Sequence, residues 1–262
     1  MLDATRDDRP FEHQHMSYVS ALKRKERVGA EADVVLQSAN VRALTGIIGG
    51  FLALSMGLML LFVLPAPRGA RRLATSQLAL FAALGFGFML LEIVLLERSS
   101  LLLGHPTVGV VTVLTSMLLA LAVGSAMSER LMPELWLSVR GAVAALSLIA
   151  VAALPIVLPL LAPGARGVSP TLRPLIIGGV ILIGATPLGL LLPTALRVIG
   201  RSQAARVSSC WAINGATSVL GTVSAALLVR TVGFAATANV ALVAYLLAVV
   251  LWLWTLRERG AS

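Results

Sequence analysis

The chain has 262 residues, of which 58% are hydrophobic and only 13% are charged, against about 45–50% and about 25% in a typical soluble domain. This composition excludes an ordinary soluble domain, and it also excludes a disordered chain, which needs few apolar residues. The net charge is +9, but aromatic residues are scarce and most basic residues lie between long apolar runs, so we expect no nucleic-acid partner.

Residues 1–42 form a charged and polar tail that lacks the apolar core of a signal peptide. A basic group within it lies on a possible amphipathic helix over Tyr18–Leu36 and consists of Lys23, Arg24, Lys25 and Arg27. Two interpretations remain open. The segment is either a solvated linker or a helix that lies on anionic lipid headgroups.

Residues 43–256 contain seven apolar runs, each close to the roughly 20 residues that a helix needs to cross a bilayer. They are Ala43–Leu64, Leu73–Leu96, Val108–Met127, Leu137–Leu161, Leu172–Leu192, Ser209–Val229 and Phe234–Leu256. The runs are too long and too uniformly apolar for the alternating strands of a barrel. The sequence therefore predicts an all-α, polytopic membrane bundle of about seven helices, followed by a short tail over residues 257–262.

Proline and glycine mark the expected connections and bends. Gly104-His105-Pro106 predicts a tight turn, and Pro163-Gly164 predicts the end of the fourth span, which we expect Pro155 and Pro159 to bend. In the fifth span, we expect Pro187 to kink or break the helix and Pro193 to close it. This is either a plain proline kink or the kind of interrupted span that exposes backbone groups to a substrate in transporters.

The clearest candidate site residue is Glu92, because an ionisable group inside a span is costly unless it is paired or faces water. Gly85 lies on the same helix face and would let another helix approach closely, so Glu92 is predicted to point into the bundle. It would bind a cation, carry a proton, or pair with a basic group on another span.

Three further residues are candidates for substrate or ion binding. Glu97 lies beside Arg98 at the expected end of the same helix, where the two form either an interfacial ion pair or part of a site. His105 is either a turn residue or a titratable partner of the two glutamates. Asn214 shares a helix face with Ser218 and Gly221, which predicts a close packing interface or, alternatively, a polar cavity with Glu92.

No catalytic constellation, cofactor motif or metal-ligand cluster is apparent, so we expect no catalytic residue, no cofactor and no metal. The single cysteine, Cys210, excludes an internal disulfide. Whether the chain has enzymatic activity stays open, with the balance against it for this chain alone.

Three segments together resemble the C-terminal membrane region of bacterial spermidine synthase-like transmembrane proteins. They are GFGFMLLEIVLLERSSLLLGHPTVGVVTVLTSMLLALAVGS (85–125), TPLGLLLPTALRVIGR (186–201) and CWAINGATSVLGTVSAALL (210–228). The opening Thr5–Phe11 looks like the tail of the aminopropyltransferase/methyltransferase-like domain that precedes these spans in that family. Glu97 departs from the glutamine that is usual there.

The resemblance implies a multi-pass module of the bacterial cytoplasmic (inner) membrane. It would anchor or partner a separately encoded soluble synthase-like domain and handle its small cationic product, because the nucleotide-binding domain of the family is not in this chain. The alternative is an independent small-molecule or ion transporter that uses Glu92 and the broken fifth span. Arginines at the span ends favour a cytoplasmic C-terminus, although the basic tail nearly cancels this bias.

Overall fold

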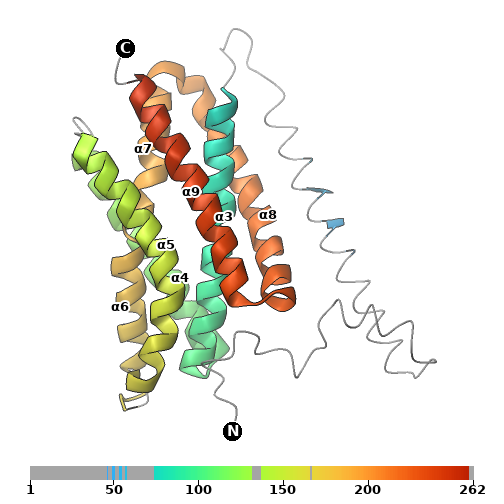
Figure 1. Cartoon of the computed structure of the whole chain (residues 1–262), viewed down its shortest axis with the longest axis vertical. Coiled ribbons are helices and arrows are strands. Elements are labelled where there is room, and N and C mark those ends of the chain that lie inside the picture. Colours follow the sequence, from blue (N-terminus) through green and yellow to red (C-terminus); the bar gives the residue numbers. More distant parts are fainter. Residues whose placement is uncertain are drawn as a thin grey trace, which may run out of the picture.

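The computed structural model describes residues 74–131, 137–165 and 167–259, together with isolated helical residues between 46 and 57. The described chain is all helical. Its elements are α3 (Thr75–Leu103), α4 (Pro106–Leu131), α5 (Leu137–Ala165), α6 (Arg173–Ala185), α7 (Leu188–Gln203), the short 3₁₀ turn η1 (Ala204–Arg206), α8 (Val207–Thr231) and α9 (Phe234–Arg259). Figure 1 shows them as one bundle of upright helices.

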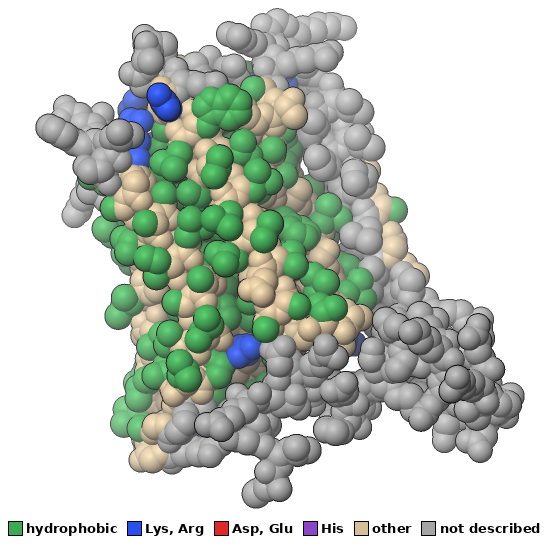
Figure 2. All heavy atoms as spheres, viewed as in Figure 1, with side chains coloured by type: hydrophobic (Ala, Val, Ile, Leu, Met, Phe, Trp, Pro, Cys, Tyr) green, Lys and Arg blue, Asp and Glu red, His purple; other side chains and the backbone are tan. Residues whose placement is uncertain are grey.

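Six segments of the described chain are long and apolar enough to cross a membrane, with α6 and α7 together forming one of them. This confirms the all-α fold and the character of a multi-pass integral membrane protein. Side chains such as Leu160 and Ile183 are more than 70% exposed, and Figure 2 shows hydrophobic side chains covering most of the face in view. Such a surface fits lipid contact. The first predicted span, Ala43–Leu64, and the basic tail residues lie outside the described residues, apart from the isolated helical positions.

Helix α3 runs through the centre of the bundle and packs against α8, α9, α4 and α5. It begins after Ala74, whose N–H donates to Gln77 Oε1 at 3.2 Å, and it ends at Gly104, whose φ of +70° is a left-handed conformation that suits glycine. The sequence placed its end near Leu96, which was wrong by two turns. A helix satisfies its own backbone, so it continues past the hydrocarbon as long as its residues pack.

Helices α3 and α8 run parallel to each other and touch at backbone distance. A Cβ added at Gly85 would meet the backbone oxygen of Asn214 and, at 2.7 Å, Thr217 Oγ1. A Cβ at Gly221 would meet the Phe86 oxygen at 2.6 Å. The predicted close approach at Gly85 is therefore confirmed, and small residues are what allow it.

The prolines of α5, α6 and α7 have different effects. Helix α5 continues through Pro155 and Pro159 and ends at Ala165, two residues beyond the predicted stop. The break at Pro187 is confirmed, because α6 ends at Ala185 and α7 begins at Leu188. The prediction that Pro193 ends this helix was wrong. Only the N–H that would bond to Gly189 is lost there, and α7 continues to Gln203 because its other backbone bonds remain.

We predict that Gly221→Leu lowers the stability of the protein by about 1–3 kcal/mol, because the added side chain has to displace the backbone of α3. Thermal unfolding in detergent, followed by circular dichroism, measures the change. Gly215→Ala on the same helix is the matched control, since a Cβ there meets nothing within 4 Å. Equal melting temperatures for the Gly221→Leu variant and the wild type would contradict the close α3–α8 contact.

Candidate functional site in the middle of the bundle

Glu92 lies on the central helix close to the middle of its span. It is three residues past the midpoint of α3, or about 4.5 Å along the axis. The side chain is 8% exposed, and Leu91, Val94 and Leu95 around it are fully buried. Glu92 therefore points into the bundle, as the sequence predicted.

The Glu92 carboxyl has no hydrogen-bond or ion-pair partner among the residues that the structure describes. One predicted alternative was that Glu92 pairs with a basic group on another span. The described spans contain no such pair. A buried carboxyl without a partner is costly in the charged form. The carboxyl is therefore chemically suited to take up a proton or a cation.

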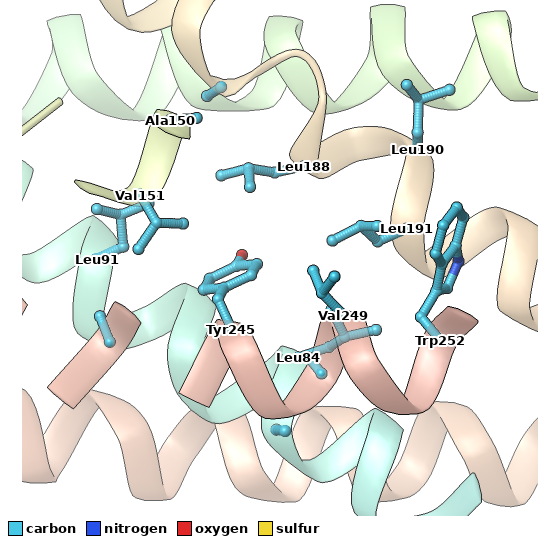
Figure 3. Close-up of a cluster of buried hydrophobic side chains, with 14 of the residues drawn as sticks. Leu84, Leu91, Ala150, Val151, Leu188, Leu190, Leu191, Tyr245, Val249 and Trp252 are labelled. Carbon is cyan, nitrogen blue, oxygen red and sulfur yellow. The ribbon is translucent and has the colours of Figure 1, made fainter. Parts of the chain in front are cut away.

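Tyr245 of α9 lies within electrostatic range of Glu92. Tyr245 is 2% exposed, and Figure 3 shows its ring among Leu188, Leu191 and Val151 with the hydroxyl directed into this apolar cluster. Within the described part of the chain the hydroxyl makes no hydrogen bond, although a buried tyrosine usually has one. Two polar groups on adjacent helices thus lie in the core without a described hydrogen bond.

Tyr245 was not among the site residues predicted from the sequence. A signal was present, because the chain has only two tyrosines and this one lies inside an apolar run instead of at a membrane interface, where tyrosines gather. Gly87 on α3 also relates to this tyrosine, since a Cβ at Gly87 would meet the Tyr245 ring at 3.1 Å.

Asn214 makes a packing contact instead of joining Glu92. Its Nδ2 donates to the Phe81 carbonyl at 3.2 Å, across the gap that Gly85 leaves. Seven residues separate Gly85 from Glu92, which is about 10 Å along the helix. The structure therefore does not bring Asn214 and Glu92 into one polar cavity, and Thr217, more than Ser218, completes the interface.

Glu97 and His105 lie toward the end of α3. Glu97 is half-buried and lies within electrostatic range of Arg230 on α8, while the Arg98 guanidinium lies 5.1 Å from the centre of the Phe234 ring. His105 is exposed in the predicted turn, where its carbonyl accepts from the Gly109 N–H at 3.0 Å. It is more than three helical turns from Glu92, too far for contact.

Two carbonyls at the break between α6 and α7 accept hydrogen bonds from described donors. The Thr186 carbonyl accepts from the Gly189 N–H at 3.1 Å, and the Pro187 carbonyl accepts from the Leu190 N–H at 3.2 Å and from Ser147 Oγ at 3.3 Å. Both carbonyls at the break thus have protein donors. The geometry favours a packed proline kink over a segment that offers its carbonyls to a substrate.

No group of three or more potential metal-ligating side chains occurs in the described ranges. In comparisons with known proteins, no family model, curated protein or solved structure matches this chain.

Because Glu92 has no described partner, we predict that Glu92→Gln leaves the melting temperature unchanged or raises it. Removing one member of a buried ion pair instead costs about 3–5 kcal/mol. The comparison variant is Thr194→Val, which removes the acceptor of the 2.7 Å hydrogen bond from Trp252 Nε1 and is expected to cost about 1–3 kcal/mol. If Glu92→Gln destabilises the protein more than Thr194→Val does, Glu92 has a structural partner after all.

Proposed function

We propose that this chain is a multi-pass membrane protein that takes up a proton or a small cation at Glu92, in the interior of the helix bundle. The observation that carries the proposal is a carboxyl buried near mid-span without a described partner. A charged group in this position is costly, and it is retained mainly where it serves an ion or proton pathway.

Tyr245 supports the same function. A phenol hydroxyl beside a carboxyl offers a hydrogen-bond donor to the charged form and an oxygen ligand to a cation. Tyr245 and Glu92 together would supply the hydrogen-bond donor and the oxygen ligands that a site for a proton or a small cation needs. The broken fifth span contributes packing around Tyr245 through Leu188 and Leu191 (Figure 3) and no ligand of its own.

The proposed location is the bacterial cytoplasmic membrane, with the C-terminus in the cytoplasm. The end at which α5 begins and α9 ends, the arginine-rich end, holds Arg140, Arg197, Arg201, Arg206 and Arg257. The opposite end holds Arg98, Arg173 and Arg230. Within the described chain this distribution favours the arginine-rich end as the cytoplasmic one.

We predict that Glu92→Gln abolishes proton movement into proteoliposomes that contain the purified protein. An internal pH-sensitive dye, with a potassium diffusion potential as the driving force, measures the movement. Tyr245→Phe, which keeps the ring and removes the hydroxyl, is expected to reduce the rate partially. Glu129→Gln is the matched control, because it removes a carboxyl whose described partner is Arg197, at 3.0 Å on the surface.

A second arm of the same assay identifies the cargo. Radiolabelled spermidine accumulates instead of protons if the site takes a small organic cation. Wild-type rates equal to those of empty liposomes in both arms, or wild-type activity in Glu92→Gln, would reject the proposed function.

The synthase-like resemblance adds a second candidate function, in which the bundle partners a soluble synthase-like domain and handles its cationic product. The segments that carry the resemblance fold as α3 with α4, α7 and α8, and these helices contact one another. They therefore form one packed unit, as expected if the resemblance reflects a common membrane module.

This second function predicts that an open reading frame for a soluble synthase-like domain adjoins the coding sequence. It further predicts that this domain co-purifies with the tagged bundle in mild detergent. A catalytically unrelated soluble protein, expressed in the same way, is the control. Absence of both the reading frame and the co-purification would remove this candidate and leave the role of Glu92 untouched.

A further inference from the structure

Arg140 bridges α5 and α9 at the arginine-rich end. Its Nη1 donates to the Leu256 carbonyl at 3.2 Å, which lies in the last turn of α9. Its Nε is buried and has no hydrogen-bond partner in the described chain. One N–H of the guanidinium therefore caps α9, and other N–H groups can donate to a further acceptor.

A second guanidinium lies next to this cap. Arg257 follows Leu256 directly, is exposed, and has no partner among the described side chains. Figure 2 shows Lys and Arg side chains at both ends of the face in view, with more of them at the upper end. Two cations that share no described acid favour an anionic ligand.

The lipid-facing side of α9 leads directly to this pair of arginines. One stripe along the helix, which we call the α9 stripe, combines exposed apolar residues with an aromatic residue and a cation. It consists of Val243, Leu247, Val250, Trp254 and Arg257, and its first four members are 51–64% exposed. Their spacing of three or four residues places them on one helix face.

This order of residues matches the order of groups in a phospholipid. In a bilayer, the aliphatic side chains would face acyl chains, and an exposed tryptophan suits the interface between hydrocarbon and headgroup. Arg257 and Arg140, at the end of α9 and the start of α5, would then face the phosphates. A guanidinium binds phosphate through two parallel N–H donors, a geometry that lysine does not reproduce.

We propose that Arg140 and Arg257 form a binding site for the phosphate of an anionic phospholipid whose acyl chain lies along the α9 stripe. The site is at the membrane surface of the end opposite Glu97 and is independent of the cargo at Glu92. The bound lipid would hold the ends of α5 and α9 together by adding acceptors to the Arg140 cap.

Native mass spectrometry of the full chain in detergent, titrated separately with phosphatidylglycerol and phosphatidylcholine, tests the site. Phosphatidylglycerol should bind the wild type more tightly than phosphatidylcholine does. Arg257→Gln and Arg257→Lys should each weaken phosphatidylglycerol binding, the former about tenfold, which is the loss of one charge-assisted contact. Arg140→Gln should also weaken phosphatidylglycerol binding, but it removes the cap of α9 as well. The Arg257 variants keep that cap and therefore test the site without this change in the fold.

Arg230→Gln is the matched control, since it removes one arginine from the opposite end and should leave phosphatidylglycerol binding unchanged. A parallel titration with inorganic phosphate separates a lipid site from a phosphate site. Binding of inorganic phosphate as tight as that of phosphatidylglycerol would overturn the lipid assignment. Wild-type phosphatidylglycerol affinity in Arg257→Gln would overturn the site itself.

Discussion

The backbone contact between α3 and α8 determines where the polar groups of this bundle lie. Gly85 and Gly221 let the two helices approach until a Cβ on either would collide with the backbone of the other. Gly87 lets the Tyr245 ring of α9 pack against another side of α3. With α4 and α5 also packed against α3, the Glu92 side chain is only 8% exposed. From Glu92 to the nearer end of the helix is about 16 Å, too far for its carboxyl to reach the interface.

This isolation contrasts with the treatment of other polar side chains in the core. Thr194, Thr237 and Thr255 each donate to the carbonyl four residues earlier in their helix, which satisfies the hydroxyl at little cost. Trp252 Nε1 donates a hydrogen bond to Thr194 Oγ1 across the α7–α9 interface. A bundle that satisfies these groups has the means to pair a carboxyl as well. The fully buried Ser99 hydroxyl on α3 also lacks a hydrogen-bond partner in the described chain. Glu92 differs from it in being a carboxyl, whose charged form is costly in the core, and this is the basis of the proposed function.

The sequence predicted the existence of the six described spans because apolar length alone determines whether a helix crosses a bilayer, although the ends of two of them were seven and nine residues too early. It failed where a single residue was interpreted without its surroundings. Glu97 suggested an early end for α3, but Arg230 on α8 lies near enough to support a carboxylate inside the helix. Pro193 suggested closure of a helix that packing continues. The Arg140 cap was beyond prediction, because its acceptor lies 116 residues away along the chain and only the tertiary fold joins them.

The position of Glu92 along α3 bears on which cargo it accepts. The helix runs from the arginine-rich end to the opposite one (Figure 1), so Glu92, past the midpoint, is nearer the end that holds Glu97. Glu97 lies five residues further on, about 7.5 Å along the axis, and forms a half-buried acidic step between that end and Glu92. Arg230 on α8 lies within electrostatic range of Glu97, so this acidic step has a cation nearby. A cation at this point weakens the attraction to a multiply charged organic cation, which would also lose much hydration on entry. If Glu92 serves the proposed function, this arrangement would therefore favour a proton over a polyamine as its ligand.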